Sequence, residues 1–164
     1  MESRVIKYIN LLSRLFYTSH LNTTRSKYHH HATKTMDYPN RHDFTFFIRA
    51  LEQYSKSLTS TMNQIDKDSG QKITDKIVLK DIRNNIEKVD QMSKTLLDGD
   101  INSRNNTYAE NKKSMCAAFA CYIECLDEIK KSFLTRIGKN AYVDFDETNK
   151  EIESCLDLQK RFCL

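Results

Sequence analysis

The sequence predicts an all-α protein: a long antiparallel three- to four-helix bundle with a separate N-terminal amphipathic helix. Two observations lead to this fold class. The 164 residues include only three Gly, one Pro and no Trp, whereas 29% of them are charged. This composition has too few turn residues for an all-β fold. Apolar side chains also recur at alternating steps of three and four, which is the spacing of one helix face.

Charge divides the chain into two predicted parts, residues 1–36 and residues 37–164. The first part holds six Lys or Arg and the single acid Glu2, whereas the second holds 20 bases and 21 acids. The basic excess therefore belongs to the N-terminal part, and the predicted helical bundle of residues 37–164 is nearly neutral. A nucleic-acid-binding domain usually carries a basic face on the domain itself. A nucleic-acid partner is thus expected only as an alternative.

Residues 3–18 are predicted to form an amphipathic helix with a basic polar face, followed by a flexible linker over residues 19–40. Lys7 and Arg14 interrupt the apolar run, which excludes a membrane span and argues against a secretory signal peptide. Three interpretations of this helix stay open: a mitochondrial presequence, a helix on an anionic membrane surface, or a segment that packs on the bundle or is dispensable. The apolar face of the predicted helix consists of Val5, Tyr8, Ile9, Leu12, Leu15 and Phe16.

The first helix is expected to be dispensable for folding of the rest. It is separated from the next predicted helix by a linker of about 20 residues, and a segment on such a tether adds little stability unless it docks. A chain that begins at Met36 should therefore melt at nearly the temperature of the full chain, as followed by circular dichroism. A loss of several kcal/mol would place Val5, Ile9, Leu12 and Phe16 in the core.

Two helices are predicted in the first half of residues 37–164. One begins near Asn40 or Asp43, either of which can cap free backbone amides, and ends before Gly70. The next begins at about Thr74 and ends before Gly99, where a left-handed cap is expected. Both carry a heptad-like apolar stripe, as in coiled coils.

Two more helices are predicted after a polar loop at residues 100–106. The longer one covers residues 107–137 and ends before Gly138. The last begins at Asp144, whose side chain is expected to form a capping box with Glu147. The core of the bundle is expected to include Phe47, Leu51, Leu58, Ile82, Ile86, Val89, Phe119, Leu126, Ile129 and Phe133.

The five cysteines are predicted to be reduced structural thiols. Cys116, Cys121 and Cys125 lie on one predicted helix, where they cannot easily pair with one another. Cys155 and Cys163 lie eight apart in the last helix, and the set does not offer four zinc ligands with one pair on a tight turn. We therefore expect an intracellular protein, cytoplasmic or nuclear, with a mitochondrial location as the alternative.

No residue is predicted to be catalytic, to bind a cofactor or to hold a metal. The histidines at 29–31 fall in the predicted linker and cannot present a closed ligand shell. The acids at 144–147 are explained by helix capping, and the mixed charges at 127–131 by a solvated helix face. A phosphate loop, a nucleophile elbow and a paired His and Cys signature are all missing from the sequence. We therefore predict that the protein is not an enzyme.

The sequence thus predicts a non-enzymatic helical protein–protein interaction module of adaptor or scaffold type, or a small subunit of a larger assembly. Its helix faces are expected to pair with partner helices or with a second copy. Two alternatives stay open. One is a nucleic-acid-associated protein that uses the basic arm of residues 4–34, and the other is an organelle-imported helical protein with a presequence-like N-terminus.

Overall fold

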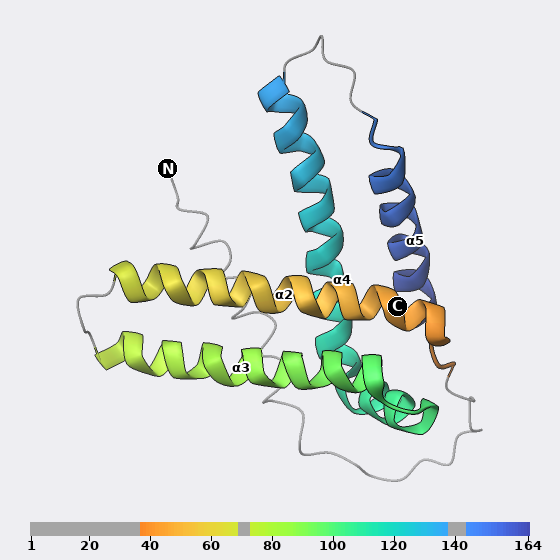
Figure 1. Cartoon of the computed structure of the whole chain (residues 1–164), viewed down its shortest axis with the longest axis horizontal. Helices are drawn as coiled ribbons and strands as arrows, with labels where there is room; N and C mark the ends of the chain where they lie inside the picture. The colour runs from red at the N-terminus through yellow and green to blue at the C-terminus, as the bar shows by residue number, and fades with distance from the viewer. Residues whose placement is uncertain (1–36, 69–72, 138–143) are drawn as a thin grey trace. The chain divides into compact units, whose positions relative to one another are not determined.

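The computed structural model describes residues 37–68, 73–137 and 144–164. These residues form four α-helices and no strand (Figure 1), so the all-α prediction is confirmed, and the arrangement is compatible with a helical bundle. The helix predicted at residues 3–18 and most of the linker predicted at 19–40 lie outside the described residues.

The first described helix, α2 (Arg41–Asp68), begins at a reciprocal capping box. The backbone N–H of Asp43 donates to Oδ1 of Asn40 at 2.9 Å, and the backbone N–H of Asn40 donates to Oδ2 of Asp43 at 3.0 Å. Each side chain thus satisfies an amide that the start of a helix leaves without a partner. The start predicted near Asn40 is confirmed.

The next helix, α3 (Ile73–Asp98), lies beside α2 (Figure 1). Ser55 of α2 donates a hydrogen bond to Asp90 of α3 at 2.7 Å. The buried side chains in the described part of α3 share one apolar face, which meets α2 while the polar face stays in water. They are Ile82, Val89, Met92 and Leu96.

The α3 helix ends before Gly99, whose backbone lies close to the preceding turn of that helix. Its N–H donates to the Thr95 carbonyl at 2.9 Å, and a Cβ added to Gly99 would lie 2.4 Å from that same oxygen. The left-handed conformation predicted for Gly99 is wrong, since its φ lies outside that region. Glycine is needed here because a side chain would collide with the backbone of the preceding turn.

Replacing Gly99 by Ala is expected to lower the free energy of unfolding by about 1 to 3 kcal/mol. The added methyl group meets a backbone oxygen, which cannot rotate away as a flexible side chain can. Urea unfolding would measure the loss, with Asp98→Ala at the exposed neighbouring position as the control. Equal unfolding midpoints for both variants would show that the turn between α3 and α4 relaxes at little cost.

The following helix, α4 (Ile101–Ile137), begins earlier than predicted, so the polar loop predicted at residues 100–106 is wrong. Asp100 caps it, since its Oδ1 accepts from the Ser103 backbone N–H at 2.7 Å. This hydrogen bond also lowers the pKa of Asp100. A break occurs instead at Asn111, whose φ of −118° and ψ of 16° are not helical.

The last helix, α5 (Asp146–Phe162), lacks the predicted capping box. Oδ1 of Asp144 accepts from the backbone N–H of Asp146 at 2.8 Å, two residues on rather than three. Phe145 occupies the cap position without a side-chain hydrogen bond. The pairing expected between Asp144 and Glu147 is therefore wrong, and the helix starts two residues later than predicted.

At the centre of the core, which also includes Val89, Met92 and Leu96 of α3, lies an aromatic cluster built by α2, α4 and α5. Phe47 of α2 stacks on Phe119 of α4 with ring centroids 4.8 Å apart, and it meets the edge of Tyr108 at 5.8 Å. Phe162 of α5 packs against Phe47 at 6.5 Å. Phe47, Tyr108 and Phe119 are fully buried. The sequence did not predict Tyr108, because it precedes Phe119, the first residue of this helix that was assigned to the core.

The predicted core is confirmed in part. Ile86 and Leu126 are half-buried, and Ile129 and Phe133 are exposed, so their placement in the core is wrong. For the three of these residues that lie on α4, the cause is visible in Figure 1: α2 crosses α4 instead of following it, and beyond the crossing α5 is the helix beside α4. The predicted residues that are buried are Phe47, Leu51, Leu58, Ile82, Val89 and Phe119.

Candidate functional site

The C-terminal part of α4 carries the candidate site, a group of exposed apolar side chains that we call the α4 end surface: Ile129, Phe133 and Leu134. They are 55%, 45% and 49% exposed, respectively. Residues four apart are neighbours on one face of a helix, so Ile129 and Phe133 share a face and Leu134 lies next to it around the helix. Phe133 meets the ring of Phe145 edge-on at 6.1 Å, which covers only part of its surface. Ile129 and Phe133 thus continue the apolar stripe of α4 beyond the buried core.

Charged side chains surround the α4 end surface. Lys131 forms an ion pair with Asp127 one turn earlier, and both side chains are well exposed. Lys130 donates a hydrogen bond to Oδ1 of Asn149 at 2.7 Å, which joins α4 to α5. Glu128 is exposed. The surface is therefore an apolar strip with charges of both signs nearby in the sequence.

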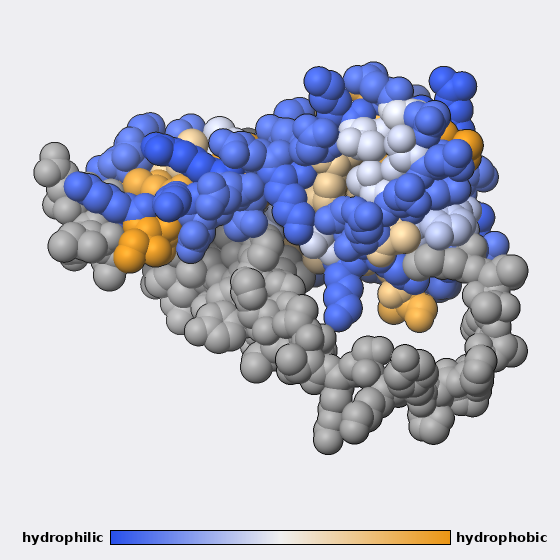
Figure 2. Space-filling model, turned by 90° about the horizontal axis from the view of Figure 1, so that it is seen from below, coloured by the Kyte–Doolittle hydropathy of each residue, from blue (hydrophilic) through white to orange (hydrophobic). Residues whose placement is uncertain are grey.

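A second group of exposed apolar side chains lies on α3. Ile77 and Val78 are 60% and 43% exposed near the start of that helix. Figure 2 shows apolar surface over this end of α3, with polar surface around it. Leu97 and Ile101 are also exposed where α3 passes into α4. Ile77 and Val78 are adjacent in sequence and do not share a helix face, whereas Ile129 and Phe133 are four apart and do, so we regard α4 as the stronger candidate.

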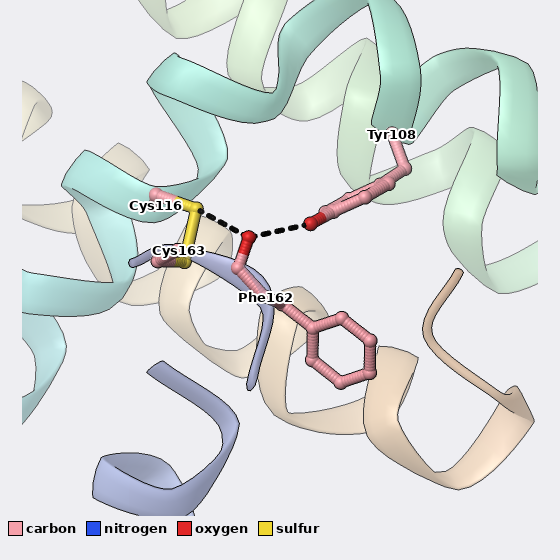
Figure 3. The surroundings of a disulfide bond; sticks show 4 residues. All are labelled: Tyr108, Cys116, Phe162 and Cys163. Atoms are coloured by element: carbon pink, nitrogen blue, oxygen red, sulfur yellow. Dashed lines mark hydrogen bonds between the residues drawn. A yellow bond between two sulfur atoms is a disulfide. The ribbon is translucent and has the colours of Figure 1, made fainter. Parts of the chain in front are cut away.

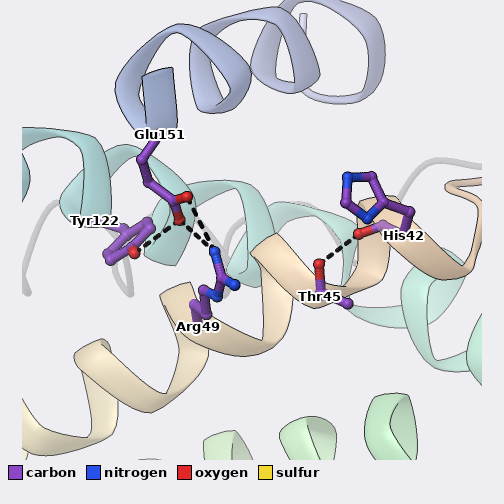
Figure 4. A network of polar contacts seen from close by, with 5 residues as sticks. All are labelled: His42, Thr45, Arg49, Tyr122 and Glu151. Atoms are coloured by element: carbon purple, nitrogen blue, oxygen red, sulfur yellow. Dashed lines mark hydrogen bonds and ion pairs between the residues drawn. The ribbon is translucent and has the colours of Figure 1, made fainter. Parts of the chain in front are cut away.

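A polar network joins α2, α4 and α5 at their meeting point (Figure 4). Arg49 donates to both carboxylate oxygens of Glu151, at 2.8 and 3.0 Å, and Tyr122 donates to Oε1 of Glu151 at 3.1 Å. Nearby, Thr45 donates to the carbonyl oxygen of His42 at 2.6 Å within α2. A single guanidinium nitrogen of Arg49 and the phenol of Tyr122 thus hold one carboxylate.

The electrostatics of this network keep Tyr122 and Arg49 in their ordinary charge states. Burial and the neighbouring Glu151 carboxylate raise the pKa of Tyr122 to about 12, so the phenol is a hydrogen-bond donor at neutral pH. The hydrogen bond to Glu151 raises the pKa of Arg49. A general acid or base needs a pKa near the working pH. We interpret the network as a link between helices.

The structure places Cys116 and Cys163 in a disulfide that ties α4 to the end of α5, with their Cα atoms 5.5 Å apart (Figure 3). The prediction that all five cysteines are reduced is wrong for this pair. Beside the bridge, the hydroxyl of Tyr108 donates to the carbonyl oxygen of Phe162 at 2.9 Å. The sequence offered no signal for this pair, since the two residues lie 47 apart on different helices.

The other three cysteines are free thiols at the inner faces of α4 and α5. Cys155 is buried, and Cys121 and Cys125 are half-buried. Burial raises the pKa of Cys155 to about 12 and that of Cys121 to about 11, and it also raises the pKa of Cys125. Their thiolate fraction at neutral pH is therefore very small, which suits the predicted structural role of these three thiols.

These pKa values predict a slow and pH-dependent reaction of Cys155 with iodoacetamide. Because only the thiolate reacts, a pKa of about 12 in place of 9.0 lowers the rate at pH 8 at least about a hundredfold relative to the urea-unfolded chain. The rate in the folded protein should still be rising at pH 10. Mass spectrometry of the labelled peptides would measure it, with half-buried Cys125 as the internal comparison. Equal rates for folded and unfolded protein would contradict the assignment.

The described residues contain no group of three or more His, Cys, Asp or Glu side chains that could hold a metal ion. His42 is exposed and packs its ring edge-on against Phe46. The histidines at 29–31 lie outside the described residues. Among the residues that the structure describes, no helix has an apolar stretch long enough to cross a membrane.

The fold and the site define an all-α protein with one disulfide between α4 and α5 and an exposed apolar helix end. No family model, no curated protein and no solved structure matches the chain.

Proposed function

We propose that the protein is a non-enzymatic helical protein–protein interaction module, or a small subunit of a larger assembly. The observation that carries this proposal is the α4 end surface, where Ile129, Phe133 and Leu134 lie exposed on neighbouring turns of one helix. Single exposed apolar residues are common on protein surfaces, whereas a group that extends a helix stripe is typical of a contact with another protein.

The mode of contact that fits this surface is helix against helix. Ile129 and Phe133 follow Tyr122 and Leu126 at steps of three and four, so a partner helix laid beside α4 would continue the packing that α2 provides nearer the core. The charged residues beside the strip would lie at the edges of such a contact, where charges mainly set orientation and partner choice.

The disulfide bears on the compartment in which this module works. Disulfides persist in oxidising environments and are rare in cytosolic and nuclear proteins. The Cys116–Cys163 bridge therefore favours an oxidising compartment over the cytoplasm or nucleus. Trapping of free thiols in intact cells, followed by mass spectrometry, would recover the bridged peptide pair if this assignment is correct and two alkylated peptides if it is not.

Site-specific photo-cross-linking tests the proposed function. A photoreactive side chain at position 129, introduced into the full chain in the cells that express it, should give one discrete protein adduct. The same side chain in place of exposed Lys88 on the polar face of α3 should give none. Absence of an adduct at position 129 and equally at position 77 would overturn the proposal. Salt-dependent recovery of nucleic acid that is lost without residues 1–36 would favour the alternative function.

A further inference from the structure

The first turns of α4 carry an acceptor sequence for N-linked glycosylation, Asn105-Asn106-Thr107. The pattern is Asn, then any residue except Pro, then Thr or Ser. Among the residues that the structure describes, this is the only place where the pattern occurs. A pattern of three residues is short, so the surroundings of Asn105 decide whether it can carry a sugar.

The side-chain amide of Asn105 is turned so that its nitrogen reaches solvent. Asn105 is half-buried, and its Oδ1 atom is buried without a hydrogen-bond partner. The Nδ2 atom is not buried in this way, and it donates no hydrogen bond to another described residue. An N-linked sugar is attached to this nitrogen. The folded helix therefore leaves the attachment atom open and gives it no structural role.

Exposed apolar side chains lie beside Asn105, and we call Leu97 and Ile101 the α3–α4 corner. Ile101 lies one turn before Asn105 and Ala109 one turn after it, which is the spacing of neighbours on one helix face. Both are exposed, Ile101 to 54%, and Leu97 is 59% exposed at the end of α3. Arg104 donates to the carbonyl oxygen of Leu97 at 3.0 Å, which holds the end of α3 to the start of α4. The small side chain of Ala109 leaves room for a sugar on this face.

We propose that Asn105 carries an N-linked oligosaccharide whose first sugars lie over the α3–α4 corner. In the transfer, Nδ2 of Asn105 forms a bond to the anomeric carbon of an oligosaccharide carried on a lipid diphosphate. The bond between that carbon and the diphosphate breaks, the lipid diphosphate leaves, and Nδ2 loses one proton. The C–H faces of sugar rings are apolar, so they can pack on Leu97 and Ile101 and remove aliphatic surface from water. The modification concerns a surface other than the α4 end surface and thus goes beyond the proposed function.

The disulfide is an independent observation that points to the same route. The Cys116–Cys163 bridge favours an oxidising compartment, and the lumen of the secretory route provides both oxidising conditions and the oligosaccharide transferase. Because Asn105 is half-buried within a helix, the folded chain is a poor acceptor, and the transfer takes place on the unfolded chain during synthesis. The helix then forms with the sugar outside, since Nδ2 faces solvent.

Digestion with peptide N-glycosidase F of the full-length disulfide-bonded protein, isolated from the cells that express it, tests the proposal. This enzyme removes an N-linked oligosaccharide and converts its asparagine to aspartate. The digested protein should gain electrophoretic mobility, and mass spectrometry should find aspartate at position 105. Asn105→Gln should abolish the modification at this position completely, and so should Thr107→Ala. Asn106→Gln is the matched control, because it replaces an exposed neighbour and leaves the acceptor pattern intact.

Binding of a hydrophobic dye tests whether the sugar covers the α3–α4 corner. Asn105→Gln should bind more dye than the glycosylated wild type, and adding Leu97→Gln with Ile101→Gln to it should remove the increase. Circular dichroism of each variant shows that it is folded. An unmodified Asn105 in a chain that retains the Cys116–Cys163 bridge overturns the proposal, and so does modification confined to the acceptor pattern at Asn22. Equal dye binding by the glycosylated wild type and folded Asn105→Gln overturns the placement of the sugar over the corner.

Discussion

Replacing Cys116 and Cys163 together by Ala is expected to lower the free energy of unfolding by about 2 to 4 kcal/mol. The bridge joins residues 47 apart in the sequence. A cross-link over a loop of this length restricts the unfolded chain much more than the folded one, in which the two ends already lie together. The folded variant keeps other anchors at the same place, since Tyr108 still binds the Phe162 carbonyl and the Phe162 ring is 4% exposed. The variant should therefore remain helical at 25 °C but unfold at a lower urea concentration.

The reducing agent dithiothreitol and a thiol that forms no bridge provide the controls. Dithiothreitol should move the unfolding midpoint of the wild type to that of the double variant and should leave the double variant unchanged. Cys121→Ala removes a half-buried free thiol and should respond to the reductant as the wild type does. A wild-type midpoint that does not respond to full reduction, verified by mass spectrometry, would contradict stabilisation through the closed loop.

The helices themselves were predictable because local signals agree. Asn40 and Asp43 are three apart, which is the spacing of a capping box, and the structure forms both hydrogen bonds. The start of α4 was missed because residues 101–106 are mostly polar, and composition suggested a loop there. The side chain of Asp100 caps this segment and makes it helical, a local signal that the sequence contained but that composition outweighed.

For the candidate site, the sequence predicted that the residues form an apolar helix face but not that this face is exposed. Periodicity assigned Ile129 and Phe133 to the apolar face of their helix, and both do continue that face. Periodicity does not say which other helix reaches a given turn, however, and α2 crosses α4 before these positions (Figure 1). The Cys116–Cys163 bridge was missed for the same reason, because it depends on how α5 lies against α4 and not on any local spacing. Sequence patterns could therefore not predict which helices contact one another.

Replacing Phe47 by Ala should cost about 3 to 5 kcal/mol of unfolding free energy, whereas Phe133→Ala should cost less than about 1.5 kcal/mol. Phe47 is fully buried, stacks on Phe119 at 4.8 Å and touches the rings of Tyr108 and Phe162. Its removal leaves a cavity among residues of three helices. Phe133 is 45% exposed and meets only the Phe145 ring among the aromatic side chains of the described residues. Much of its surface is therefore in water before and after the change.

The comparison is well matched because both variants remove the same ring from a position that the sequence assigned to the core. Urea unfolding is best followed by circular dichroism at about 1 μM chain, where association between chains contributes little to stability. At that concentration the difference between the two variants reports burial within one chain. Equal losses would mean that Phe133 lies in the core after all, and Ile129 and Phe133 could then not form an exposed surface.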